Sequence, residues 1–188
     1  MSDQIQSTQP TPTLPNQVFR TLALPFFRVL YRVLSQPEVS GYDNIPKNGP
    51  HLITANHLSY YDPPLAISYW PYPVEVLGAA SQMAKPGIGH IMRCYGTHAV
   101  RRDSSASDLP VIRLALSLLR TGYSIFIMPE GQRNPDGLGE AQLGAAYLAS
   151  KADIPIIPVA ITGTEKIFQS LRRGHRQKLH MQIGPQYR

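Results

Sequence analysis

A histidine and an aspartate lie five positions apart in the segment Asn56-His57-Leu58-Ser59-Tyr60-Tyr61-Asp62. Residues at this spacing do not share a face of a helix, but a turn between them can bring the carboxylate of Asp62 back to the imidazole of His57. Such a carboxylate would fix the tautomer of the ring and stabilise the imidazolium that forms when His57 takes a proton. The pair is therefore a candidate general base. The alternative is a helix-capping Asp62 beside an incidental histidine.

The sequence offers no serine nucleophile to complete a triad with this pair. It contains no Gly-x-Ser-x-Gly motif, because the nearest run, Gly122-Tyr123-Ser124-Ile125-Phe126, lacks the second glycine. The hydroxyl that His57 activates would then belong to a substrate, or to water in an esterase or thioesterase.

The segment Met128-Pro129-Glu130-Gly131-Gln132-Arg133-Asn134 follows a continuous apolar run. Gly131 permits a close approach of the backbone to a ligand, and Arg133 carries a planar fork of donors that suits a phosphate group. Glu130 could orient Arg133 or hold a hydroxyl. The alternative is a polar turn with a surface ion pair.

Two adjacent arginines end the segment Gly96-Thr97-His98-Ala99-Val100-Arg101-Arg102. Neighbouring side chains of an extended chain point to opposite sides, so we expect only one of them, Arg101, to enter a site.

The elements that would position these residues alternate along the chain. Short apolar runs predict strands, and apolar residues at helical spacing predict helices between them. The pattern favours an α/β fold, with a mostly parallel central sheet flanked by helices and an N-terminal basic amphipathic helix. In such a sheet the ligand site lies at the carboxyl ends of the strands, where the three segments converge. Pro155 and Pro158 favour an edge or bulged position for the last strand. The predicted strands are 51–55, 74–80, 97–101, 123–128 and 154–162, and the predicted helices are 62–69, 108–120 and 140–151.

The sequence divides into three parts. Residues 1–16 are polar and predict a disordered tail, residues 17–35 predict a basic amphipathic helix, and residues 41–188 form the main domain. The helix carries an apolar stripe opposite Arg28 and Arg32, so it could lie on a membrane surface or pack on its own domain. The stripe consists of Phe19, Leu22, Phe26, Leu30 and Val33.

The composition bounds the class of protein. In a chain of 188 residues, 43% apolar and 16% charged residues indicate one globular domain. A single cysteine, Cys94, argues against internal disulfides and multi-cysteine zinc sites. The polar start and the lack of a long apolar run argue against a secretory signal and a spanning helix.

The net charge of +6 favours an anionic partner. The partner could be a nucleic acid, a phosphate-bearing substrate or an acidic membrane surface. A basic cluster near the C-terminus would suit a non-catalytic binder, yet no zinc-finger or phosphate-loop motif is present, so we expect no nucleic acid. The cluster consists of Arg172, Arg173, Arg176 and Lys178.

Four segments together resemble the motifs of the glycerolipid acyltransferase family, typified by the 1-acylglycerol-3-phosphate (lysophosphatidic acid) acyltransferases. His57 and Asp62 match its His-x4-Asp motif, and residues 96–101 resemble its arginine-containing block. Residues 129–134 resemble its Pro-Glu-Gly-Thr-Arg-Ser block, and residues 154–159 its proline-containing fourth block. Gln132 and Asn134 replace the usual Thr and Ser, which leaves the acceptor headgroup open.

The resemblance implies transfer of a fatty acyl group from acyl-CoA or acyl-carrier protein, as co-substrate, to the free hydroxyl of a lysophospholipid or glycerol phosphate. It implies that His57 is the base, that Asp62 orients it, and that Arg101, Glu130, Gly131 and Arg133 bind the acceptor's phosphate end. Backbone N–H groups at the start of the helix after Asp62 are candidate donors to the oxyanion. The family implies no metal and no cofactor, and a peripheral location on the cytoplasmic face of a membrane.

Overall fold

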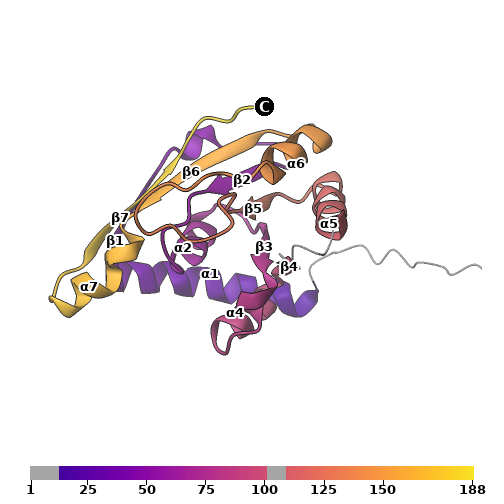
Figure 1. Ribbon diagram of the computed structural model, residues 1–188. Coiled ribbons are helices and arrows are strands. Elements are labelled where there is room, and N and C mark those ends of the chain that lie inside the picture. Colours follow the sequence, from indigo (N-terminus) through magenta and orange to yellow (C-terminus); the bar gives the residue numbers. More distant parts are fainter. Residues whose placement is uncertain (1–12, 101–108) are drawn as a thin grey trace, which may run out of the picture.

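The computed structural model describes residues 13–100 and 109–188 (Figure 1). Within these ranges the strands form one sheet in the order β1-β7-β6-β2-β5-β3-β4, and all neighbours pair in parallel except β6 and β7. The predicted mostly parallel α/β sheet is therefore confirmed. The strands are β1 Ser35–Ser40, β2 Leu52–Ala55, β3 Glu75–Ala79, β4 His98–Val100, β5 Ile125–Ile127, β6 Ile156–Thr162 and β7 Gln177–Ile183.

Helices cover the sheet on both sides. In Figure 1, α1 runs along one side of the sheet with α2 packed between them, while α5 and α6 lie on the other side. The helices are α1 Leu14–Leu34, α2 Asp62–Tyr69, α3 Ala80–Met83, α4 Ile88–Tyr95, α5 Leu109–Arg120, α6 Gly144–Ala152 and α7 Ile167–Arg172, with 3-10 turns at Tyr42–Asn44 and Thr164–Lys166.

Alternate residues of the central strands fill two separate cores. In β2, Leu52 packs with α5 and α6, whereas Ile53 packs with α1 and α2. Ile125 and Phe126 divide in the same way in β5. Successive side chains of a strand point to opposite faces, and both faces here are buried, which explains why these strands read as continuous apolar runs.

Helix α1 begins at Leu14, three residues before the predicted start. One face of it, which includes Leu24 and Tyr31, packs in the core. The predicted stripe is not this packed face, because Leu22, Phe26 and Val33 are exposed. The opposite face carries a second apolar stripe that is exposed to solvent. That stripe consists of Leu14, Val18, Leu22, Phe26, Val29 and Val33.

The predicted edge position of the strand at 154–162 is wrong, because β6 lies between β7 and β2. Pro155 precedes the strand. Pro158 lies where the ladder to β7 ends, and its carbonyl accepts the N–H of Gly184 at 2.8 Å. A proline is tolerated there because the N–H that it lacks would have no partner in β7.

Sequence reasoning missed β1, α3, α4 and α7 and placed the start of α6 at Glu140 instead of Gly144. Strand β1 pairs with β7 alone among the described strands, so it needs little apolar character and tolerates Pro37.

Candidate active site

The site lies at the carboxyl ends of β2, β3, β4, β5 and β6. The loop after β2 starts with Asn56, whose side chain pins the end of β2 to β6: its Nδ2 donates to the carbonyl of Ile161 at 2.8 Å, and its Oδ1 accepts the N–H of Ile161 at 2.7 Å. His57 follows directly. The neighbouring strand therefore fixes the backbone that presents this histidine.

The structure brings His57 and Asp62 together. Nδ1 of His57 lies 3.1 Å from Oδ2 of Asp62. Asp62 is fully buried and also accepts the N–H of Ser59 at 2.6 Å, the hydroxyl of Ser59 at 3.3 Å and the hydroxyl of Thr164. These bonds fix the carboxylate, which in turn orients the ring. Because Nδ1 faces Asp62, Nε2 on the other side of the ring remains available to a substrate in the cavity that His57 lines.

The start of α2 cannot provide the expected oxyanion donors. Asp62 is the first residue of the helix, and Pro63 and Pro64, which have no N–H, come next. The N–H of Leu65 already donates to the carbonyl of Tyr61 at 3.1 Å. Asp62 makes no capping bond either, so the helix-cap interpretation of this residue is wrong.

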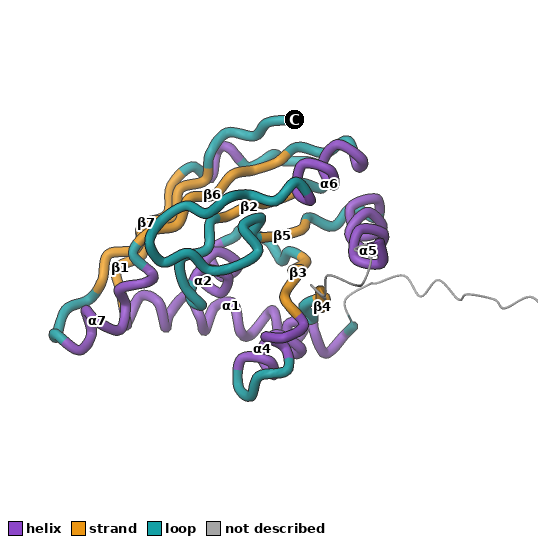
Figure 2. Tube along the Cα trace, in the orientation of Figure 1, coloured by secondary structure: helices purple, strands orange, loops and turns teal. Residues whose placement is uncertain are grey.

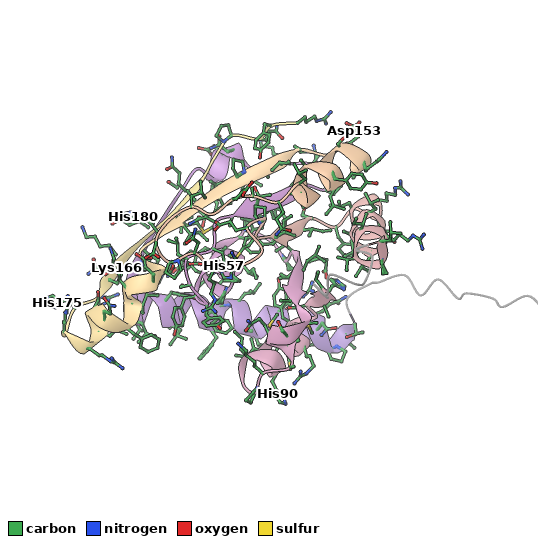
Figure 3. The ribbon with its side chains drawn as sticks, viewed as in Figure 1. His57, His90, Asp153, Lys166, His175 and His180 are labelled. Atoms are coloured by element: carbon green, nitrogen blue, oxygen red, sulfur yellow. The ribbon has the colours of Figure 1, made fainter. Side chains whose placement is uncertain are left out.

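A cavity of about 1300 Å³ adjoins His57. Its walls come from α1, the α3–α4 segment, β3 and α7, and they are largely apolar. Among the described residues that line it, Lys85 and Arg133 are the lysine and arginine side chains, and none is an aspartate or a glutamate. Figure 3 shows His57 in the interior of the molecule, whereas His90 and His175 lie at its periphery.

Arg133 lies at the rim of the cavity, where its guanidinium stacks on the ring of Tyr60, 3.5 Å from the centroid. Gly131, in the same loop, has a φ of 72°, which favours glycine, and its N–H donates to the carbonyl of Met128 at 3.0 Å. This loop, which connects β5 to α6 (Figure 2), thus presents Arg133 next to the histidine turn.

Glu130 does not orient Arg133. It is buried, its Oε1 accepts the N–H of His57 at 3.0 Å, and its Oε2 accepts the N–H of Gly139 at 2.9 Å. The carbonyl of His57 accepts the N–H of Asn134 at 2.7 Å. These bonds tie the β5–α6 loop to the backbone of His57. Because both carboxylate oxygens accept these bonds inside the protein, the predicted contact of Glu130 with a substrate phosphate has no geometric support.

The predicted phosphate ligand Arg101 lies outside the described residues. Strand β4 ends at Val100, which lines the cavity.

Sequence reasoning missed Thr164, Tyr60 and Lys85. Thr164 was detectable in principle, since it comes just after the predicted strand 154–162, at the same sheet edge as His57. Within 13–100 and 109–188, no three His, Cys, Asp or Glu side chains form a group that could hold a metal ion.

The family model and the curated relatives that match this chain are all described as acyltransferases. The family model described as Acyltransferase matches residues 36–162. The 1-acyl-sn-glycerol-3-phosphate acyltransferase of Borreliella burgdorferi is 31% identical over 131 residues, which is 69% of this chain and 52% of that protein. The chloroplastic enzyme BAT2 of Brassica napus, with the same activity in its name, is 28% identical over 73% of this chain and 40% of its own length.

A solved structure supports the fold. The 1-acyl-sn-glycerophosphate (LPA) acyltransferase PlsC from Thermotoga maritima superposes with a TM-score of 0.69 at 23% identity, over 92% of this chain and 70% of that one. The chain spans about half or less of the length of the two curated relatives above.

Proposed function

Because the chain belongs to the acyltransferase family, we propose that it transfers a fatty acyl group from acyl-CoA or acyl-carrier protein to the free hydroxyl of 1-acylglycerol-3-phosphate. The observation that carries this proposal is the position of the His57–Asp62 pair beside a large apolar cavity whose described lining contains two cations and no acid. An apolar chain and an anionic headgroup both find complementary surroundings there.

In the proposed reaction, Nε2 of His57 takes the proton of the acceptor hydroxyl, and the oxygen attacks the carbonyl carbon of the thioester. The tetrahedral intermediate collapses with cleavage of the C–S bond, and the leaving thiolate receives the proton from His57. The products are an ester and a free thiol. Asp62 keeps the proton of Nδ1 in place and stabilises the imidazolium, as its four accepted hydrogen bonds allow.

The dimensions of the cavity suit a long acyl chain. Its volume of about 1300 Å³ exceeds the roughly 300–1,000 Å³ of typical small-molecule pockets. Leu24 and Phe27 of α1 and Ile88 and Met92 of α4 line it, and burial of methylene groups against such side chains contributes about 0.8 kcal/mol each.

We assign the acceptor's phosphate end to the rim, where Arg133 lies, with Gly131 beside it and with Arg101 as a further expected ligand. Glu130 holds the loop in place instead. Arg133→Ala should mainly raise KM for the phosphorylated acceptor, and an effect confined to KM for the acyl donor would reassign Arg133 to the donor.

We also propose that the protein binds peripherally to the cytoplasmic face of a membrane through α1. None of the helices in the described part of the chain is long and apolar enough to span a bilayer. The exposed apolar stripe of α1 suits a helix that lies in the plane of a membrane surface. The basic cluster lies near the end of this helix, since Arg176 donates to the carbonyl of Ser35 at 2.7 Å.

The test uses the purified full chain with labelled acyl-CoA or acyl-carrier protein and a panel of lysolipids, with the products resolved by mass. We expect acylated lysolipid with the wild type and none with His57→Ala, whose circular dichroism should be unchanged. His90→Ala is the matched control, because His90 is exposed and does not line the cavity. Free fatty acid released without any lysolipid would indicate a hydrolase, and full turnover by His57→Ala would refute the base.

A further inference from the structure

Tyr60 lies between two cations at the rim of the cavity. Arg133 stacks on the face of its ring, while Nζ of Lys85 lies 5.6 Å from the ring centroid and donates to the phenol oxygen at 3.4 Å. Tyr60 sits in the turn between His57 and Asp62, where the N–H of Tyr61 donates to the hydroxyl of Ser59 at 3.1 Å. The turn that holds the catalytic pair therefore also fixes the ring that both cations contact.

Neither cation has an acidic partner among the described residues. They are also the two permanent positive charges of the described cavity lining. The hydrogen bond from Lys85, with the guanidinium of Arg133 nearby, lowers the pKa of the Tyr60 phenol. Two unpaired like charges beside one ring repel each other, and a bound dianion would remove this repulsion.

We propose that Lys85 and Tyr60, together with Arg133, form a cradle that selects an acceptor bearing a phosphomonoester. The inference rests on the proposed function and deepens it by adding two specificity-determining residues, Lys85 and Tyr60, to the site that receives the phosphate of 1-acylglycerol-3-phosphate. The guanidinium offers a planar fork, the ammonium a point charge, and the phenol a further polar group, which together suit the three terminal oxygens of a phosphomonoester. A phosphocholine or phosphoethanolamine headgroup has one negative charge and brings a cation, which Lys85 would repel.

Steady-state kinetics of the full chain test the cradle. Lys85→Met should raise KM for 1-acylglycerol-3-phosphate about tenfold or more, because one charge-assisted hydrogen bond is lost. The value of kcat and KM for the acyl donor should stay within about twofold. Lys85→Arg should recover most of the loss, and Tyr60→Phe should raise the same KM by a smaller factor.

Lys151→Met is the matched control, because Nζ of Lys151 also lies near an aromatic ring, 5.9 Å from the centroid of Tyr147, outside the cavity lining. It should leave both KM values unchanged. The cradle is refuted if Lys85→Met changes KM no more than this control does. A rise in KM for acyl-CoA instead would assign Lys85 to the phosphates of the donor and overturn the proposal.

A binding measurement separates this inference from the proposed function. Titration calorimetry with a short-chain 1-acylglycerol-3-phosphate should show binding to the wild type that Lys85→Met weakens about tenfold or more, while the phosphocholine analogue binds both proteins weakly and equally. This outcome supports the cradle even if acyl transfer is not observed. Equal binding of the two headgroups by the wild type overturns it even if acyl transfer is observed.

Discussion

The buried ion pair between α1 and the sheet predicts a large loss of stability when one partner is removed. The side chains of Arg20 and Glu75 are only 4% and 1% exposed. Nη1 and Nη2 of Arg20 donate to the two oxygens of Glu75 at 2.6 and 3.0 Å, and Nε2 of His98 lies 2.9 Å from Oε2. Burial alone would raise the pKa of Glu75, but the bonds with His98 and Arg20 outweigh it and hold this pKa below its ordinary value.

Glu75→Gln keeps the shape of the side chain but replaces one accepting oxygen with a donating amide. At least one charge-assisted bond is lost, at about 1.5–3 kcal/mol, and the buried guanidinium of Arg20 loses its counter-charge. Removing one partner of such a pair costs about 3–5 kcal/mol in total. At about 2–4 °C per kcal/mol for a domain of this size, Tm should fall by about 6–20 °C.

Thermal and urea unfolding followed by circular dichroism measure this loss. The matched control is Glu38→Gln, because Glu38 also contacts a histidine, His180 at 3.2 Å, but is 62% exposed, and it should cost less than about 1 kcal/mol. Equal losses for the two variants would refute the reasoning. Because the pKa of Glu75 is lowered in the folded state, its contribution is present above pH 4.5 and is lost as the pH falls below that value.

Asp62→Asn should lower kcat by about 10³–10⁴-fold, because an amide favours the wrong tautomer of His57; a loss of less than tenfold at saturating substrates would contradict the role of Asp62. Burial lowers the pKa of His51. Below pH 6.5 the unfolded chain therefore binds more protons than the native one, and the free energy of unfolding decreases as the pH decreases. Urea titrations of His51→Asn at pH 5–7 should show a weaker pH dependence, and an unchanged one would exclude His51 as its source. Leu22→Glu should reduce co-sedimentation with anionic vesicles, whereas Leu138→Glu, in the exposed β5–α6 loop, should not; similar binding of the two variants would argue against α1 as the membrane contact.

The sequence predicted best where a single local rule decides the structure. The apolar run at 51–55 became β2, and α2 has the predicted bounds, 62–69, although Asp62 does not cap it. The contact between His57 and Asp62 was also predictable, because only four residues separate them. These features depend on neighbours in the chain, so periodicity and turn chemistry suffice.

The parts that sequence reasoning missed depend on contacts between distant residues. Strand β1 is polar and forms only because β7, more than 130 residues away, offers an open edge. Thr164 reaches Asp62 from the end of the neighbouring strand β6, and Glu130 bonds to the backbone of His57 instead of to Arg133 of its own loop. Such contacts follow from the order of strands in the sheet, which no local pattern encodes.

The ion pair between Arg20 and Glu75 also explains which apolar face of α1 packs inward and which is exposed to solvent. Helix α1 is apolar on two faces, and hydrophobic burial alone does not decide which of them packs inward, because it is not directional. The guanidinium of Arg20 reaches its partners, Glu75 and the carbonyl of Tyr95 at 2.8 Å, in one rotation of the helix only. This rotation directs Leu24 and Phe27 to the cavity and leaves Leu22 exposed. The geometry of the buried pair therefore makes one rotation of α1 specific.

We expect the double variant Arg20→Met/Glu75→Leu to be more stable than Glu75→Gln but to protect the amides of α1 less well from hydrogen exchange than the wild type does. Wild-type protection of α1 in that variant would show that the Arg20–Glu75 pair does not set the rotation.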